Sequence, residues 1–224
     1  MSVAHWSTLG DFRRAGTQKG FTILELMIAS GVFAVILLIV AAGVISFTNS
    51  YYKGITTSKT QAAARDIMNT LSQAIQFGQF VTTPTYNGAA TTYGMCIDDT
   101  LYAFRPGQEV TDTPPFGANQ GYHGLVAMHG CSLPATLPAS ASLVNGRELL
   151  GEHMRVNALD VTQNGDLYTI HLRIVYGDND LLVQPLPSNV PDWLTTAETC
   201  AGSQAGTQFC AVADLTTTVE KRLL

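Results

Sequence analysis

The apolar stretch KGFTILELMIASGVFAVILLIVAAGVISF, residues 19–47, sets the architecture of this 224-residue chain. From Leu26 to Phe47 it has 22 residues without a charged side chain, enough to cross a bilayer as one α-helix. Residues 1–20 carry three cations against one carboxylate, and an aromatic and cationic boundary, Tyr-Tyr-Lys, follows at residues 51–53. Because cationic flanks stay in the cytoplasm, the pattern predicts a cytoplasmic N-terminus and an extracytoplasmic remainder.

Two other interpretations of this stretch are open on composition. One is the buried core helix of a soluble protein, although such helices are usually shorter. The other is a cleavable secretory signal, for which Ala41 and Gly43 would be the small residues at the cut. A signal has an apolar part of only about 7–15 residues, and here Glu25 interrupts its beginning. The residues at the start of the helix therefore have to distinguish these interpretations.

Those residues indicate a processing site. Gly20 ends the basic flank, and a protease can approach its backbone because it has no side chain. Glu25 lies four residues after Phe21, on the same helical face, and a charge in a spanning helix costs about 3 kcal/mol at the bilayer centre. Cleavage after Gly20 would create an α-amino group on Phe21 that compensates this carboxylate. A glutamate that snorkels to the interface is the simpler alternative.

Residues 20–26, Gly-Phe-Thr-Ile-Leu-Glu-Leu, resemble the cleavage and methylation motif of the type IV prepilin family, and the resemblance extends over residues 19–50. It implies that a membrane-embedded prepilin peptidase cuts between Gly20 and Phe21 and then N-methylates Phe21. It also implies that Glu25 neutralises the Phe21 amine of a neighbouring subunit during filament assembly.

The chain departs from the commonest members of that family in two respects. Ala42 stands where many major pilins carry a helix-breaking proline, so that Gly43 is the local weak point of the helix. The leader is twenty residues long, and the remaining 204 residues are acidic, with nine Lys and Arg against sixteen Asp and Glu. These departures favour a minor pilin or pseudopilin over a major pilin.

The expected fold class is α+β and pilin-like, with a long N-terminal helix packed on an antiparallel sheet. Apolar residues continue at three- and four-residue steps between residues 55 and 78, which predicts one helix from residue 21 to about 77. We expect four segments: a cleaved cytoplasmic leader, a transmembrane and filament-core helix, an amphipathic second half of that helix, and a globular β-rich head. Their bounds are residues 1–20, 21–48, 49–80 and 81–224.

Strands are predicted in the head from alternating patterns and turn signals. The two expected hairpins pair residues 91–97 with 101–104 and residues 156–162 with 167–176, the second around an Asn-Gly turn. Residues 215–219 indicate a last strand. Residues 111–142 are rich in Pro, Gly and Ala, and they are expected to form a long surface loop.

Four cysteines lie in the part of the chain predicted to be outside the cytoplasm, where disulfides persist. Loop proximity favours Cys96–Cys131 and Cys200–Cys210, while the two other pairings and free buried thiols remain alternatives. A C-terminal disulfide loop of this kind resembles that of many pilins.

Nothing in the sequence indicates catalysis. It has no nucleophile elbow, phosphate-binding loop or dinucleotide fingerprint, so we expect neither enzymatic activity nor a cofactor. The four histidines of the predicted head, His123, His129, His153 and His171, have no metal-box spacing and are expected to be surface or core residues. Asp178-Asn179-Asp180 is a weak calcium candidate, because it lacks the glycine and the distant glutamate of a calcium loop.

Composition narrows the function classes further. With 46% apolar and 13% charged residues the chain is not disordered, and its net charge of −5 argues against a nucleic-acid partner.

We expect a structural subunit of a type IV pilus or a type II secretion-like filament. The expected partners are prepilin peptidase, other pilins, an inner-membrane assembly platform and membrane lipid. The protein would be single-pass in the cytoplasmic membrane, and then part of a cell-surface or periplasmic filament. The alternative is a membrane-anchored extracytoplasmic binding or adhesion domain.

Overall fold

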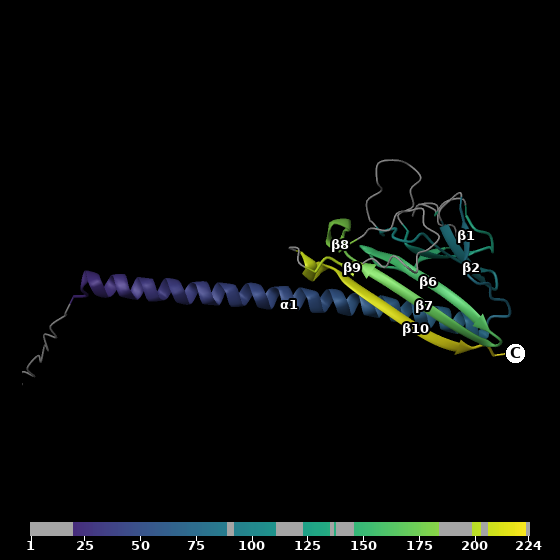
Figure 1. Ribbon diagram of the computed structural model, residues 1–224, viewed down its shortest axis with the longest axis horizontal. Coiled ribbons are helices and arrows are strands. Elements are labelled where there is room, and N and C mark those ends of the chain that lie inside the picture. Colours follow the sequence, from purple (N-terminus) through teal and green to yellow (C-terminus); the bar gives the residue numbers. More distant parts are fainter. Residues whose placement is uncertain are drawn as a thin grey trace, which may run out of the picture. The chain divides into compact units, whose positions relative to one another are not determined.

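The computed structural model describes residues 20–88, 92–110, 123–134, 137, 146–183, 199–202 and 206–222. Within them one α-helix, α1, runs unbroken over Ile23–Phe77 (Figure 1). The chain divides into two compact units, Met1–Ser46 and Phe47–Leu224, so that α1 contributes to both. The helix begins two residues later than predicted from the sequence and ends where it was expected.

In the first unit α1 is apolar over most of its surface, and all of its residues are exposed. Its large apolar side chains between residues 23 and 45 are all more than half exposed. By length and composition this is a helix that could cross a membrane. A helix that is hydrophobic all round needs lipid or other helices around it.

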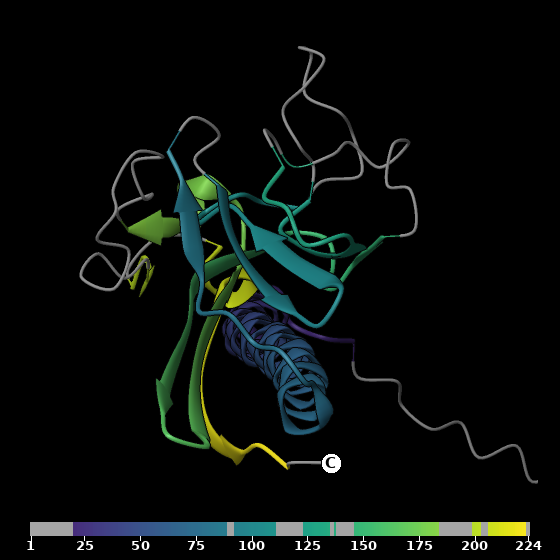
Figure 2. The same cartoon turned by 90° about the vertical axis from the view of Figure 1, so that its right-hand side faces the viewer.

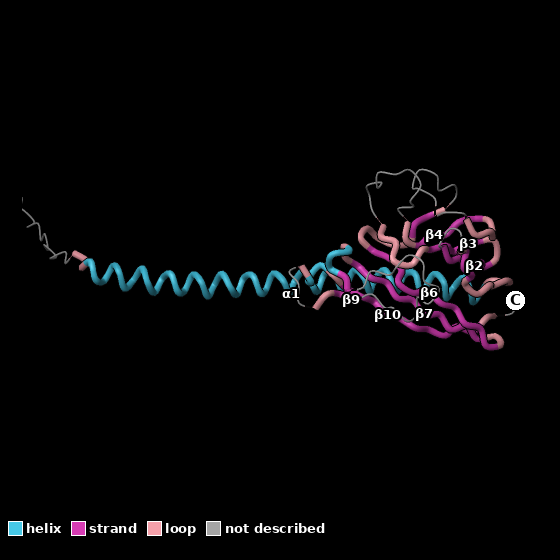
Figure 3. The backbone as a smooth tube through the Cα atoms, turned by 45° about the horizontal axis from the view of Figure 1, so that its top comes forward, coloured by secondary structure: helices cyan, strands magenta, loops and turns pink. Residues whose placement is uncertain are grey.

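The second unit contains three antiparallel sheets. The five-stranded sheet has the order β1-β2-β3-β4-β5, with bounds Thr85–Asn87, Thr92–Ile97, Thr100–Phe104, Leu125–His129 and Arg147–Glu148. The three-stranded sheet has the order β10-β7-β6, with bounds Ala211–Glu220, Leu167–Tyr176 and Met154–Asn164. A small sheet pairs β8 (Leu182–Val183) with β9 (Thr199–Cys200). Figure 3 shows β6, β7 and β10 running side by side.

The core of this unit forms where the second half of α1 meets the two larger sheets. The helix buries one stripe at three- and four-residue steps, Thr56, Thr60, Ala64, Ile67, Met68, Leu71 and Ile75. This stripe packs in one cluster with fully buried side chains from both sheets, among them Phe104, Leu125, Leu159, Ile170 and Leu172. Figure 2 shows this part of the helix flanked by the two sheets. The predicted α+β class, a long N-terminal helix packed on antiparallel sheet, is confirmed.

The strands predicted from alternation are present: β2 and β7 lie within the predicted ranges, and β3, β6 and β10 extend beyond them by one to four residues at an end. The Asn-Gly hairpin is present: β6 reaches Asn164, and Gly165 takes the positive φ of 64° that the tight turn requires. The turn between β2 and β3 also serves the helix. Asp98 Oδ1 accepts hydrogen bonds from the backbone N–H groups of Gln79 (2.8 Å) and Phe80 (3.0 Å), just beyond the end of α1.

The expectation of one long loop over residues 111–142 was wrong in part. Residues 125–129 form strand β4, which pairs with β3 on one side and with β5 on the other in the five-stranded sheet. Leu125 and Val126 are completely buried. The run is short and lies between glycines, so that its strand character depends on pairing with β3, which is distant in sequence. Residues 111–122 and 138–142 lie outside the described residues.

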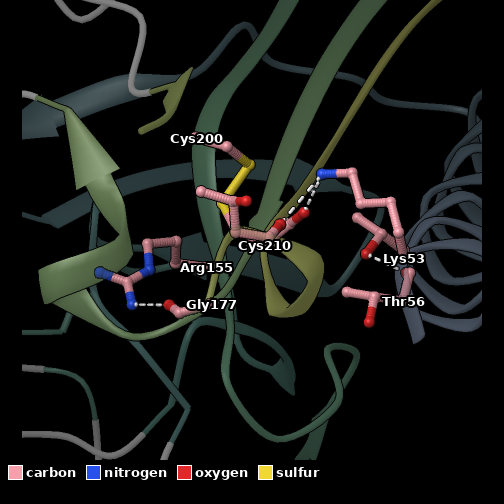
Figure 4. The surroundings of a disulfide bond; sticks show 8 residues. Lys53, Thr56, Arg155, Gly177, Cys200 and Cys210 are labelled. Atoms are coloured by element: carbon pink, nitrogen blue, oxygen red, sulfur yellow. Dashed lines mark hydrogen bonds between the residues drawn. A yellow bond between two sulfur atoms is a disulfide. The ribbon is translucent and has the colours of Figure 1, made fainter. Parts of the chain in front are cut away.

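Two disulfides are present in the head, Cys96–Cys131 and Cys200–Cys210, each with a Cα–Cα distance of 5.7 Å. These are the pairs that loop proximity favoured. Figure 4 shows that the second bond lies beside α1, where Lys53 Nζ donates to the carbonyl oxygens of Cys210 (2.6 Å) and Thr207 (3.3 Å). The C-terminal loop is thus attached to the head part of the helix as well as to the sheet.

We expect the disulfide that closes the longer loop to stabilise the head more. The sequence separations are 35 for Cys96–Cys131 and 10 for Cys200–Cys210. On the chain-entropy model they are worth about 4 and about 3 kcal/mol. Denaturant unfolding of the full chain in detergent would compare the two Cys→Ser double variants with the wild type. A double variant as stable as the wild type, or the reverse order, would contradict this expectation.

Candidate processing and assembly site

The predicted cleavage site lies immediately before α1, in a segment without regular secondary structure. Gly20 and Phe21 are both exposed, and Phe21 has 87% of its surface open to solvent. A Cβ atom placed on Gly20 would meet no other atom within 4 Å. Within the described residues the fold therefore leaves room for a side chain at this position, and any demand for glycine here has to come from a partner. The rest of the predicted leader, residues 1–19, lies outside the described residues.

The first turn of α1 is closed by a capping box between Thr22 and Glu25. The backbone N–H and the hydroxyl of Thr22 each donate to Glu25 Oε2 at 3.1 Å. In return the backbone N–H of Glu25 donates to Thr22 Oγ1 at 3.2 Å. This reciprocal pair satisfies two backbone donors at the helix start and explains why α1 begins at Ile23. Sequence reasoning missed it, although Thr-x-x-Glu before an apolar run is its usual signature.

The capping box engages only one oxygen of the Glu25 carboxylate. Glu25 is exposed, and its other oxygen, Oε1, has no hydrogen-bond partner in the part of the chain that the structure describes. A carboxylate held in this way is oriented by its own helix and still able to accept a hydrogen bond from a cation outside the subunit. The geometry is therefore compatible with two roles for Glu25, helix capping and charge pairing.

The described residues form an α+β protein, in which the long N-terminal helix α1 is apolar in its first half and the head contains antiparallel sheets. A family whose model is described as the prokaryotic N-terminal methylation motif matches residues 16–41, which include Gly20, Phe21 and Glu25. The chain thus carries a prokaryotic N-terminal methylation motif that overlaps the start of its apolar helix α1. No curated protein and no solved structure matches the chain.

The other predicted site residues are distributed over the head. The residues of the weak calcium candidate have different surroundings: Asn179 Oδ1 accepts from Arg155, and Asp180 is exposed and belongs to no group of three or more metal-capable side chains among the described residues. Asp178 instead lies beside His153, with 3.1 Å between Oδ1 and Nδ1.

The histidines occupy different environments. His171 Nε2 lies 2.8 Å from Asp214 Oδ1 on an exposed part of the three-stranded sheet, and His129 is exposed near Asp99. His123 is buried, and its Nδ1 is 3.0 Å from Glu148 Oε2. The hydrogen bond to Glu109 raises the pKa of His153, and the carboxylates nearby add to this effect while burial opposes it.

Proposed function

We propose that this chain is a minor pilin or pseudopilin, a structural subunit of a type IV pilus or a type II secretion-like filament. One observation carries the proposal: the methylation motif at residues 16–41 leads without a break into a helix that also forms the core of a folded head. The motif accounts for processing, the apolar part of the helix for insertion and assembly, and the head for what the filament displays.

The exposed apolar surface of α1 supports assembly through the N-terminal helix. More than twenty residues of helix present Leu, Ile, Val, Phe and Met side chains that no described part of the head covers. Before assembly lipid would cover this surface, and after assembly the helices of neighbouring pilins would replace the lipid. The partners in this proposal are prepilin peptidase, an inner-membrane assembly platform and the other pilins of the filament.

Two features support the minor or pseudopilin assignment within this proposal. α1 continues without interruption through Ala42 and Gly43, the place where many major pilins have proline. The processed chain would also be strongly acidic, with sixteen Asp and Glu against nine Lys and Arg. The head would lie outside the cytoplasmic membrane, where its two disulfides are stable.

Replacing Gly20 tests the processing step. Gly20→Leu should leave an unprocessed precursor in the membrane, because a peptidase that must approach the backbone meets a bulky side chain. The fold should not change, since the space around Gly20 is open. N-terminal sequencing and intact mass of the membrane-bound protein would show Met1 in the variant and Phe21 in the wild type. The twenty extra residues correspond to about 2 kDa at a usual mean residue mass of about 110 Da.

Gly31→Leu is the matched control for this experiment. Gly31 also lies in open space, within the same unit, and it is eleven residues away from the proposed cut. We expect this variant to be processed normally. Normal processing of Gly20→Leu would contradict the proposal. A wild-type protein that keeps Met1 would favour the anchored binding domain, and an N-terminus near residue 44 would favour a secretory signal.

A further inference from the structure

Three metal-capable side chains converge in the head from segments that are far apart in sequence: Glu109 after β3, His153 before β6, and Asp178 after β7. His153 Nδ1 lies 2.9 Å from Glu109 Oε1 and 3.1 Å from Asp178 Oδ1. One ligand atom from each residue lies within 4.8 Å of the other two. We propose that this cluster is a binding site for a divalent first-row transition ion, for which Zn²⁺ is the reference. The proposal does not depend on the proposed filament role.

The separations suit such an ion. Zinc binds imidazole nitrogen and carboxylate oxygen at about 2.0–2.2 Å, so neighbouring ligand atoms in a tetrahedral site are about 3.3 Å apart. The two distances from His153 Nδ1 are within a few tenths of an ångström of that value. After a small outward movement of the three side chains, a metal ion would occupy the space between Nδ1 and the two carboxylate oxygens.

The backbone holds the three ligand-bearing segments together at positions next to the ligands. The His153 N–H donates to the carbonyl of Val110 at 2.9 Å, beside Glu109. The Gly177 N–H, beside Asp178, donates to the carbonyl of His153 at 3.0 Å. His153 itself has a φ of 60°. The relative positions of the three side chains are therefore determined by the fold before any ion binds.

A buried arginine orients both carboxylate segments. Arg155 is 1% exposed, and its Nη2 donates to Glu109 Oε2 at 2.8 Å, which leaves Oε1 directed at His153. Its guanidinium also donates to the Gly177 carbonyl, as Figure 4 shows, and to Asn179 Oδ1. These contacts brace the backbone on both sides of Asp178. Arg155 is a positioning residue in this site, comparable to the outer-shell partners that orient metal ligands elsewhere.

The second nitrogen of His153 also has a partner of the kind found around bound metals. Nε2 lies 3.5 Å from Glu152 Oε1, a carboxylate placed to attract the Nε2 proton when the ion occupies Nδ1. A cavity of about 190 Å³ adjoins the cluster and is lined by His153, Asp178, Tyr176 and Gly177 among others. It has room for the waters that would complete the coordination of the ion.

The ligand chemistry selects the class of ion. Imidazole is a ligand for zinc, copper, iron and nickel, whereas calcium takes six to eight oxygens, more than this cluster offers. The charges agree with a divalent cation, since the carboxylates of Glu109, Glu152 and Asp178 outnumber the Arg155 guanidinium by two. The weak calcium candidate at Asp178 and Asp180 is a different site, because it would use oxygen ligands alone and not His153.

Calorimetric titration with Zn²⁺ tests the proposal on the full chain in detergent, prepared without a polyhistidine tag. We expect one saturable site, and a loss of affinity of at least tenfold in His153→Asn and in Asp178→Asn. Asparagine tolerates the left-handed backbone of His153, and thermal unfolding without metal would verify that each variant is folded. Asp178 is exposed, so its variant provides the answer if His153→Asn does not fold.

His129→Asn is the matched control, because His129 is exposed and lies outside the cluster. It should bind Zn²⁺ as the wild type does. The proposal is overturned if the wild type shows no saturable zinc binding or if Asp178→Asn binds with unchanged affinity. It is also overturned if millimolar Ca²⁺ displaces the zinc and Asp180→Asn abolishes this displacement, which would indicate the oxygen-only site.

Discussion

Glu25→Val is expected to yield a subunit that is processed but does not enter filaments. Under the proposed function, cleavage leaves a positive α-amino group on Phe21 that must enter a low-dielectric helix core, and Glu25 is the one carboxylate in the apolar helix. Breaking a buried ion pair by removing one partner costs about 3–5 kcal/mol, so incorporation should fall at least about a hundredfold. Processing should survive, because it depends on Gly20 and the flank. Pull-down of processed protein with its partner pilins measures the effect.

The capping box makes a sharper version of this experiment possible. Glu25→Gln removes the charge but retains an acceptor oxygen for the Thr22 N–H and hydroxyl, so helix capping is preserved. Thr22→Ala does the opposite: it removes the cap, worth about 1 kcal/mol, and leaves the charge. If charge pairing is the role of Glu25, the Gln variant should fail and the Ala variant should assemble. The reverse result would reduce Glu25 to a capping residue.

Glu148→Ala is expected to destabilise the head more than any other single substitution considered for it. The Glu148 carboxylate, only 16% exposed, accepts four backbone N–H groups at 2.9–3.0 Å in addition to its contact with His123. The four donors belong to residues 124, 125, 149 and 150. The Leu149 N–H also donates to the Leu125 carbonyl oxygen at 2.9 Å, so the substitution removes the carboxylate acceptor without replacement from the other three donors. Each buried donor left without a partner costs about 1–3 kcal/mol, so a total loss above about 3 kcal/mol is expected.

Thermal or denaturant unfolding of the full chain in detergent measures this loss. Glu148→Gln retains one acceptor oxygen and should lose about half as much. Glu220→Ala is the control, because Glu220 is an exposed carboxylate at the end of β10 and its removal should change stability by less than about 0.5 kcal/mol. A Glu148→Ala protein within 1 kcal/mol of the wild type would show that water replaces the carboxylate as the acceptor.

Elements with a strong local pattern were predictable from the sequence. The start of α1 follows from Thr22 and Glu25, and its head half follows from apolar residues at three- and four-residue steps. Strand β7 alternates so regularly that its bounds, Leu167–Tyr176, coincide with the prediction. Strand β4 was missed because a five-residue run has too little pattern of its own and depends on its neighbours in the sheet.

The two candidate sites differ in the same respect, since a local sequence pattern identifies one of them and not the other. Gly20, Phe21 and Glu25 are close together in the chain, and one short motif with a following apolar helix identifies them. Glu109, His153 and Asp178 have no common motif, because 44 and 25 positions separate the three residues. They meet only because β6 and β7 are hydrogen-bonded neighbours and the segment before Val110 is held along β6.

The sequence by itself determined that this protein has an N-terminal methylation motif, one long helix and a β-rich head. These features depend on interactions within a few turns of helix or along single strands, where neighbouring residues carry the whole signal. Only the tertiary structure decided the place of β4 between β3 and β5, the role of Glu148 and the cluster around His153. These features depend on contacts across tens of residues, because antiparallel pairing brings distant segments together and hydrophobic periodicity does not record which segments will meet.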